Sequence, residues 1–292
     1  MIIDCHAHFE PRLLNEKQII RNMDQVGIDK TCLIPLLTDP PESKKPDFPM
    51  KMQRFMFNSN LLRPLGIAIT KSMYQKKGEW KLWFNKKKST SESLKLITDP
   101  DNQSVANLIS KHPDRFLGWI FLNPSLSNAL DELEKWRNTP GMIGVKIHPF
   151  WHQYSIEVAS DLAKRVQELK LPLCVHLGFG SHGDYRWLLE SFPNLTIIFS
   201  HLGVPYYKNT WHLAKQYLNV FFDISSTYHV DKKLLNKSIK IIGPEKCLFG
   251  TDTPYAHTDA ALRIKQWVED LSISDIQKEQ IFSENFLKLI KI

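Results

Sequence analysis

The sequence predicts a (β/α)8 barrel of the TIM type, with a long insertion after its second strand. Three observations support this prediction. Eight short apolar runs alternate with amphipathic helical segments along the 292 residues. Most of the runs are continuously apolar, which is typical of a parallel sheet covered on both faces. Polar residues, many of them histidines, follow the runs at the end where such a barrel forms its active site.

The eight expected strands are short and β-rich. They cover residues 2–8, 30–37, 115–124, 142–149, 171–178, 195–203, 220–225 and 246–252. On the first strand, the period of two places Asp4, His6 and His8 on one face, with Cys5 and Ala7 on the other. An open doubly wound sheet is the alternative fold. It usually has a glycine-rich phosphate turn after its first strand, and HAHFEP does not resemble one.

Helices are expected between the strands and at the end of the chain. Their helical apolar spacing covers residues 15–27, 101–112, 128–138, 155–170, 185–192, 207–218, 231–242, 261–271 and 274–290. Asp101 and Ser155 stand where N-cap residues are expected. We interpret the whole chain, 1–292, as one barrel domain.

The insertion, residues 38–100, is unusually long for a barrel connection and is typical of a lid or a substrate-binding excursion. It contains most of the net charge of +7, because residues 71–88 hold seven lysines and one glutamate. Aromatic residues lie among these lysines, namely Tyr74, Trp80, Trp83 and Phe84. This mixture could bind a nucleic acid. We favour a solvated helical lid whose aromatic side chains pack on the barrel.

Composition places the chain among ordinary globular proteins, with 42% hydrophobic and 24% charged residues. No run of about 18 apolar residues predicts a transmembrane helix. The start reaches Asp4, His6 and His8 too soon for a signal peptide. The four cysteines are scattered in apolar stretches without a CxxC pair, so we expect buried thiols in a cytoplasmic protein.

Ionisable residues follow six of the eight strands. They are His6, His8, Lys146, His148, His176, His201, Asp223 and Asp252. On a strand, every second side chain points to the same face. Several of these ionisable residues therefore share a face with residues that would fill the barrel. The pairs are Cys174 with His176, Ile197 and Phe199 with His201, and Leu248 with Asp252. The polar groups should therefore converge at one mouth.

Histidine nitrogens with a carboxylate are ligands of the zinc or manganese type. Three histidines and one aspartate, with room for water, predict a catalytic site in which a divalent metal activates that water. Asp252 could bind the metal and take a proton, and His201 could polarise a substrate carbonyl or carry a proton. Lys146 could bind an anion or, if carboxylated, bridge two metals.

Five segments resemble the amidohydrolase superfamily, and within it the amidohydrolase-related (amidohydrolase 2) branch. They are DCHAHF, GVKIHP, LPLCVHLG, LTIIFSHLG and CLFGTDTPY, in this order along the chain. The resemblance implies a barrel with a metal at its strand ends. It also implies ligands at His6, His8, His176 and Asp252, and a catalytic or second-metal histidine at His201. Lys146 falls where binuclear members carry a carboxylated lysine. The branch more often holds one metal, so we expect one divalent ion per chain, zinc before manganese.

The resemblance leaves two main reactions open. Our first expectation is a metal-dependent hydrolase of a small carboxylate-bearing lactone, ester or amide. The alternative is a nonoxidative decarboxylase of an aromatic or muconate-type acid, and a metal-dependent nuclease ranks third. We expect Lys146, His148, Trp151 and Asp223 to bind the substrate. We also expect a small-molecule substrate, no membrane or nucleic-acid partner, and a homodimer.

The remaining polar residues receive structural roles. His152, His182, His229 and His257 follow strand ends and are expected to be ordinary loop histidines. Asp4 is expected to orient a ligand histidine, as carboxylates beside metal sites commonly do.

Overall fold

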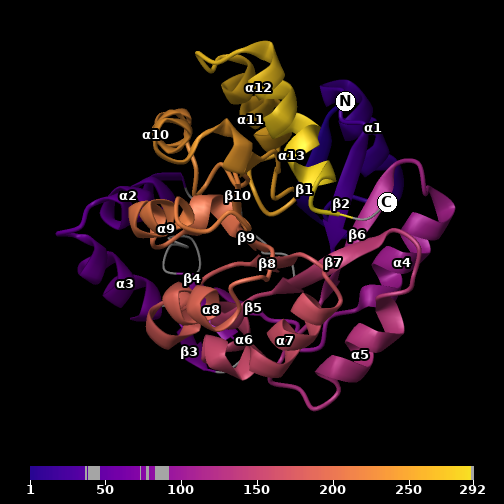
Figure 1. The fold of residues 1–292 in the computed structure, drawn as a ribbon, viewed down its shortest axis with the longest axis horizontal. Coiled ribbons are helices and arrows are strands. Elements are labelled where there is room, and N and C mark those ends of the chain that lie inside the picture. Colours follow the sequence, from indigo (N-terminus) through magenta and orange to yellow (C-terminus); the bar gives the residue numbers. More distant parts are fainter. Residues whose placement is uncertain (37, 39–46, 73, 77–78, 83–91, 291–292) are drawn as a thin grey trace.

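The computed structural model describes residues 1–36, 38, 47–72, 74–76, 79–82 and 92–290. Its centre is a sheet of eight strands in sequence order, with every pair parallel (Figure 1). The strands are β1 (Ile3–His8), β2 (Lys30–Ile34), β6 (Phe116–Phe121), β7 (Met142–Ile147), β8 (Leu173–Val175), β9 (Ile197–Phe199), β10 (Val220–Asp223) and β11 (Cys247–Leu248). All eight expected strands are thus confirmed.

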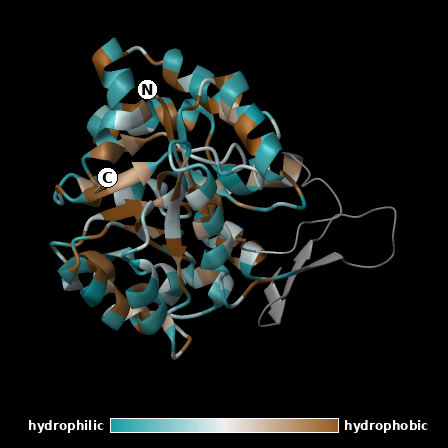
Figure 2. Cartoon of the chain, turned by 90° about the vertical axis from the view of Figure 1, so that its right-hand side faces the viewer, coloured by the Kyte–Doolittle hydropathy of each residue, from teal (hydrophilic) through white to brown (hydrophobic). Residues whose placement is uncertain are grey.

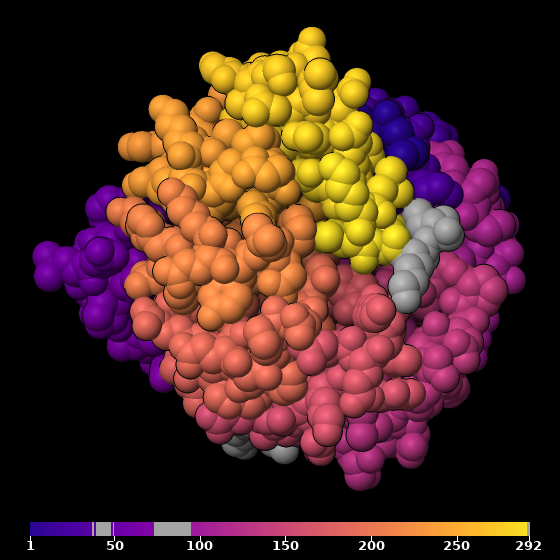
Figure 3. Space-filling model, in the orientation of Figure 1, coloured from indigo at the N-terminus to yellow at the C-terminus, as the bar shows by residue number. Residues whose placement is uncertain are grey.

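Backbone hydrogen bonds join the first strand to the segment that contains the last, and so bring the two edges of the sheet together. The Cys5 amide donates to the Phe249 carbonyl at 2.9 Å, and the His8 amide donates to the Thr253 carbonyl at 2.7 Å. Figure 3 shows the N-terminal and C-terminal segments side by side on the surface. The architecture is therefore the expected (β/α)8 barrel.

Helices cover the outside of the barrel at each expected position. They are α1 (Glu16–Val26), α4 (Asn102–Lys111), α5 (Ala129–Trp136), α7 (Ser160–Glu168), α8 (Tyr185–Ser191), α9 (Tyr207–Ala214), α10 (Lys232–Ile242), α11 (Ala260–Glu269), α12 (Asp275–Glu279) and α13 (Asn285–Leu287). Asp101 caps α4 by accepting a hydrogen bond from the Ser104 amide. Ser155 precedes a short 3-10 turn, Ile156–Ala159, without a side-chain capping bond.

The barrel interior is filled by apolar side chains, and Figure 2 shows hydrophobic strands inside helices with hydrophilic outer surfaces. The interior cluster includes Cys5, Cys32, Trp119, Cys174 and Leu248, with Phe286 of α13 packed against it. All four cysteines are free and buried, as expected. Cys174 and Leu248 lie inside, which agrees with the columns expected below His176 and Asp252.

The first strand departs from the simple alternation that we expected. Asp4 pairs with Thr31 and Ala7 with Leu33, so β1 uses one residue more than β2 over this stretch. Such a bulge shifts the phase of the side chains. Cys5 consequently faces the barrel interior, and Asp4 lies with Ala7 on the side that faces α1 and α11. Asp4 therefore points away from the barrel interior, which Cys5 enters instead.

The column expected below His201 also needs correction. Ile198 lies in the barrel interior, whereas Ile197 and Phe199 belong to the outer core under the helices. The reason is that β9 ends at Phe199, and His201 follows in a turn with φ of 53° and ψ of 49°. The turn, rather than the strand pleat, directs the His201 side chain.

The insertion contains helices, as we expected, and also a small sheet that we did not predict. Its described elements are the helices α2 (Asp47–Asn58) and α3 (Arg63–Ser72) and an antiparallel sheet of β3 (Tyr74–Lys76), β4 (Glu79–Leu82) and β5 (Glu92–Lys95). Strands thus occupy part of the lysine-rich stretch where we expected a helix. Trp83, Phe84 and the lysines at 86–88 lie outside the described residues. Across the described chain, no helix is both long and apolar enough to span a membrane.

Candidate active site

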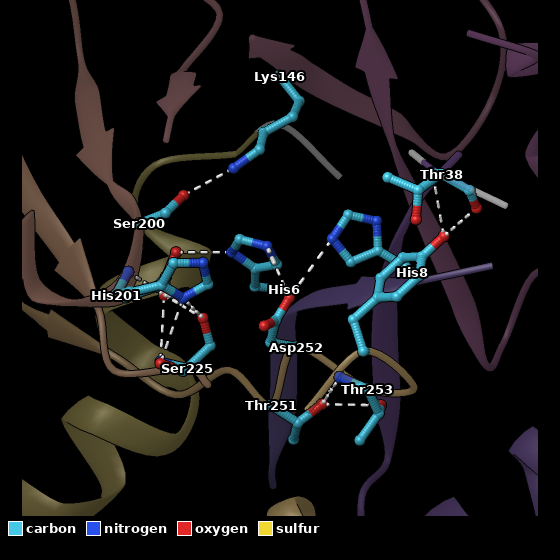
Figure 4. A network of polar contacts seen from close by, with 12 residues as sticks. His6, His8, Thr38, Lys146, Ser200, His201, Ser225, Thr251, Asp252 and Thr253 are labelled. Atoms are coloured by element: carbon cyan, nitrogen blue, oxygen red, sulfur yellow. Dashed lines mark hydrogen bonds and ion pairs between the residues drawn. The ribbon is translucent and has the colours of Figure 1, made fainter. Parts of the chain in front are cut away.

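Asp252 lies between two histidines of β1, at the centre of the barrel mouth (Figure 4). Its Oδ1 atom is 3.7 Å from Nε2 of His6 and 3.5 Å from Nε2 of His8. The Asp252 amide donates to the His6 carbonyl at 2.7 Å, which fixes this residue against β1. Its backbone has a φ of 62°, a region that non-glycine residues seldom adopt and that is often found at functional sites.

Asp223, at the end of β10, contacts both His6 and the backbone of His201. Its Oδ2 atom is 2.8 Å from Nδ1 of His6, and its Oδ1 atom accepts the His201 amide at 2.9 Å. Oδ1 also accepts hydrogen bonds from the amide and hydroxyl of Ser225. Because the carboxylate is fully buried and both oxygens have protein donors, its geometry supports an orienting role in place of the substrate contact that we expected.

Asp4 has a different function from the one we expected. Its carboxylate accepts hydrogen bonds from the His6 amide and from the amide and hydroxyl of Thr251. It therefore ties β1 to the segment after β11, while Asp223 makes the contact to the His6 ring. The β1 bulge explains why Asp4 does not contact the His6 ring, because it changes the phase of the side chains after Asp4. Burial raises the pKa of Asp4 to about 7.

His201 stands beside His6, with their ring centroids 5.0 Å apart. Its Nδ1 atom is 2.8 Å from the Ser225 hydroxyl and 3.3 Å from the Ser225 carbonyl. Gly250 allows this close packing, because an added Cβ there would lie 3.1 Å from the Cβ atoms of both His6 and Ser225. The Nε2 atom of His201 is thereby left for a metal or a substrate.

Neighbouring histidines lower the pKa values of two carboxylates of the site, and burial lowers those of two of its histidines. Burial alone would raise the pKa of Asp252, but His201 and His8 outweigh it and hold the pKa below its usual range. The pKa of Asp223 is likewise lowered, because His6 outweighs the effect of burial. Burial lowers the pKa of His201 to about 4 and also lowers that of His6. Near neutral pH, two carboxylates therefore face neutral histidines.

A second group of histidines lies across the mouth from Asp252. His148 stacks on His176 with a centroid distance of 4.1 Å, and His176 lies 4.7 Å from His201. His229, from the loop after β10, stacks on His201 at 5.1 Å and lies 5.9 Å from His176. The structure thus brings His176 to the site, one ring beyond the group around Asp252.

Lys146 points from β7 toward Ser200, as Figure 4 shows. Its Nζ atom donates to the Ser200 hydroxyl at 2.6 Å and lies 3.5 Å from the Cys174 sulfur. Among the described residues, no carboxylate lies within ion-pair distance of this buried ammonium group. A positive charge is consequently held at the base of the second histidine group.

The donor set fits a divalent metal. Two ligand atoms bound tetrahedrally to zinc lie about 3.3–3.6 Å apart, given bond lengths of about 2.0–2.2 Å. The distance of 3.5 Å from Asp252 Oδ1 to His8 falls within this range, and the distance of 3.7 Å to His6 is slightly longer. Asp223 on Nδ1 of His6 leaves Nε2 with its lone pair toward Asp252, the usual arrangement behind a ligating histidine. Ligand atoms of His6, His201 and Asp252 all lie within 4.8 Å of one another.

A second cluster of candidate ligand atoms, in His6, Cys174 and Asp223, fits a metal less well. The His6–Asp223 pair is already hydrogen-bonded. Burial raises the pKa of Cys174, which keeps the thiol protonated rather than available as a thiolate ligand.

Several site residues were missed or undervalued at the sequence level. Ser225 and Ser200 contact His201 and Lys146, and His229 was assigned to an ordinary loop. Tyr255 packs edge-on against His8 at 4.9 Å and exchanges hydrogen bonds with the backbone of Thr38. Ser200 and Tyr255 carried a signal, because they lie within the segments LTIIFSHLG and CLFGTDTPY that resemble the superfamily.

A comparison with models of protein families identifies the family of this chain. The amidohydrolase family model (Amidohydro_2) matches residues 94–292. This chain belongs to the amidohydrolase family. The match covers the strands β6 to β11 and includes His148, His176, His201 and Asp252. The resemblance noted in the sequence is therefore confirmed.

This amidohydrolase chain is similar in sequence to γ-resorcylate decarboxylases, and its fold is similar to those of a solved decarboxylase and a solved hydratase. A γ-resorcylate decarboxylase of Polaromonas sp. (strain JS666 / ATCC BAA-500) is 26% identical over 249 residues, covering 65% of this chain and 75% of the relative. The structure of a dihydroxybenzoic acid decarboxylase of Polaromonas sp. JS666, with manganese and 2-nitroresorcinol bound, superposes with a TM-score of 0.58 at 18% identity, covering 99% of this chain and 96% of that one. A 4-oxalomesaconate hydratase of Rhodopseudomonas palustris superposes with a TM-score of 0.62 at 17% identity, covering 99% and 95%. These two structures establish a shared fold.

Proposed function

We propose that this protein is a metal-dependent, nonoxidative decarboxylase of a hydroxylated aromatic acid. The similarity in sequence to γ-resorcylate decarboxylase is the observation that carries the proposal. It favours our alternative expectation over hydrolysis, which we had placed first. The reaction releases CO2 and consumes no water, so it makes the protein a lyase rather than a hydrolase.

We propose that His6, His8, His176 and Asp252 hold one divalent ion, with manganese and zinc as the candidates. When bound, such a cation would act as a Lewis acid and neutralise the negative oxygens of the substrate. The separations of Asp252 from His6 and His8 support the first part of this set. His201 stands close enough to replace His176 in it.

The reaction needs one proton at the ring carbon that bears the carboxylate. The bond from that carbon to the carboxylate breaks, its electron pair stays on the ring, and the proton takes the place of the departing CO2. Asp252 is the carboxylate suited to deliver this proton, because it is 9% exposed whereas Asp223 is completely buried. Because the pKa of Asp252 is held below its usual range, Asp252 must first take up this proton, from a phenol hydroxyl of the substrate or from water. The neutral His201 ring, with a ligand atom within 4.8 Å of that of Asp252, can relay the proton to it.

Product analysis tests the proposal. The manganese-loaded protein is incubated with 2,6-dihydroxybenzoate in D2O, and released CO2 and aromatic product are measured. We expect resorcinol with a single deuterium at the former carboxylate position. The Asp252→Ala variant should lose at least about 100-fold in rate, the order expected for a lost proton transfer. Release of CO2 at the same rate from the Asp252→Ala variant would exclude the proposed role of this residue.

We also propose that the chain forms a homodimer through the insertion helices. Phe48, Met52 and Phe55 are exposed at helical spacing on α2, and Leu65 and Ile69 are exposed on α3. A cluster of exposed large apolar side chains commonly marks an interface. Light scattering should give twice the chain mass, and the double variant Phe55→Ser with Leu65→Ser should be monomeric. Leu218→Ser, at an exposed position elsewhere, is the control and should remain dimeric.

A further inference from the structure

The hydrogen bonding of His148 determines which of its ring nitrogens carries the proton. His148 follows β7 and caps the short helix α6 (Pro149–His152), whose Trp151 amide donates to its Nδ1 atom at 3.3 Å. A ring nitrogen that accepts a hydrogen bond has its lone pair free and carries no proton. The neutral ring of His148 must therefore bear its hydrogen on Nε2.

This Nε2–H group lacks an acceptor among the described residues. The Nε2 atom is buried without a hydrogen-bond partner, and the residue as a whole is 1% exposed. Leaving a buried donor unpaired is unfavourable, so such a group calls for an explanation such as a ligand that it binds. The ring cannot easily turn away, because it is held by the Trp151 amide on one side and stacked on His176.

The surroundings of His148 and His176 contrast with the carboxylates around His6. The ionisable side chains that act most strongly on these two rings are all basic, and they include Lys146, His152, His201 and His229. Both carboxylates of the site instead lie toward β1, where they contact His6 and His8. Asp223 and Asp252 thus disfavour an acidic substrate group at β1, whereas Lys146, with no carboxylate within ion-pair distance among the described residues, favours it at β7 and β8.

We propose that the Nε2–H group of His148 donates a hydrogen bond to an acidic oxygen of the substrate, a carboxylate or an adjacent phenolate. The donor is neutral and fixed in direction by α6. This interaction orients the acidic end of the aromatic ring toward β7 and β8. The inference rests on the proposed function, and it adds a substrate orientation and a proton position to it.

Two substitutions distinguish the proposed hydrogen bond from His148 to the substrate from the capping of α6 by the same residue. His148→Asn keeps an acceptor for the Trp151 amide, since asparagine is a strong N-cap residue, but its short amide does not reach the position of Nε2. His148→Gln is longer and can place an N–H group near that position. The surface variant His112→Gln, at a side chain that pairs with Glu16, serves as the control. Circular dichroism confirms that each variant folds.

Binding of unreactive ligands gives the test. Calorimetry with the manganese-loaded full chain compares 2-nitroresorcinol, whose nitro oxygens resemble a carboxylate, with resorcinol, which lacks that group. We expect the preference for 2-nitroresorcinol to fall about tenfold in His148→Asn, as for loss of one hydrogen bond of about 1.4 kcal/mol. It should fall less in His148→Gln and stay unchanged in His112→Gln. An unchanged preference in His148→Asn would overturn the inference alone, whereas failure of the wild type to bind either ligand would overturn the proposed substrate class with it.

Nitrogen NMR gives a second readout that needs neither ligand nor turnover. Spectra of the 15N-labelled protein with and without the His148→Asn substitution identify the signals of this ring. We expect a protonated Nε2 and an unprotonated Nδ1. A ring protonated on Nδ1 would contradict the assignment, whatever the binding data give.

Discussion

At the scale of single residues, Asp223 connects the parts of the site. One carboxylate oxygen faces His6, and the other accepts hydrogen bonds from the amides of His201 and Ser225. Three elements, β1, β9 and β10, are thus positioned by one buried side chain. A hydrogen bond of this kind fixes both the tautomer and the direction of a ligating histidine.

Replacing Asp223 tests this orienting role. In Asp223→Asn the amide keeps an acceptor for the backbone donors but loses the charge that orients the His6 imidazole. We expect metal affinity and decarboxylation rate to fall about 10–100-fold, the usual cost of losing such a partner. Metal titration and steady-state kinetics measure both. Asp275→Asn, at a surface carboxylate, is the control. Equal metal affinity in Asp223→Asn and wild type would show that Asp223 does not orient a ligand.

His152 should make folding sensitive to acid. Burial lowers its pKa to about 4, against about 6.5 in an unfolded chain, so between these values the unfolded state binds more protons. Stability is therefore complete above pH 6.5 and is lost as the pH falls toward 4, by up to about 3 kcal/mol. His152→Gln cannot titrate but can still donate to the Ile97 carbonyl, the observed partner of His152.

Urea unfolding at pH 7, 5.5 and 4.5 measures this contribution. The stability difference between wild type and His152→Gln should shrink or reverse as the pH falls. A difference that stays constant with pH would mean that His152 titrates normally in the folded protein.

The residues at the strand ends could be predicted from the sequence, but their partners could not. His6, His8, His201 and Asp252 meet because parallel strands end at one edge of the barrel. The contact to the His6 ring was expected from Asp4 and comes from Asp223, because a one-residue bulge in β1 cannot be recognised from apolar spacing. His229 was undervalued because its position depends on the path of a loop.

At the scale of elements, α2 of the insertion is tied to the loop that carries His229. The Arg54 guanidinium lies 3.2 and 3.3 Å from the carbonyls of Thr227 and Tyr228, and 3.1 Å from the carboxylate of Asp231. The Arg54 side chain is mostly buried, so these bonds are poorly replaced by water. The insertion therefore supports a loop of the active site.

Replacing Arg54 should increase the local motion of α2 and of the loop that carries His229. In Arg54→Met the alkyl part still packs, but the carbonyls of residues 227 and 228 lose their donor. We expect faster hydrogen exchange in α2 and in residues 225–231, together with a raised KM, while the strands stay protected. Lys51→Met, at an exposed neighbour on α2, is the control. Unchanged exchange in residues 225–231 would show that α2 does not hold this loop.

The barrel could be predicted because most of its strands are continuous apolar runs followed by polar residues, and its helices have a clear apolar period. The insertion could not, because its helices α2 and α3 expose apolar side chains and so lack a clean amphipathic pattern. Its small sheet depends on antiparallel pairing between β4 and β5, which lie nine residues apart. Local periodicity does not reveal such a pairing.

At the scale of the whole molecule, barrel closure brings the two ends of the chain to one site. The first strand provides His6 and His8, and the segment after the last strand provides Asp252. A ligand that binds all three would connect the edges of the barrel and stabilise the folded state, by about 2.7 kcal/mol at a hundredfold excess over its Kd. We therefore expect metal removal to lower the melting temperature as well as the activity.

The central claim is that a metal at this mouth supports decarboxylation. The most direct measurement is CO2 release from 2,6-dihydroxybenzoate by chelator-treated protein, before and after manganese is restored, beside hydrolysis of a simple ester and a lactone. We predict CO2 release only with metal, its loss in Asp252→Ala, and no hydrolysis above background. Metal-dependent hydrolysis of the ester or lactone, with no CO2 released from the aromatic acid, would contradict the account.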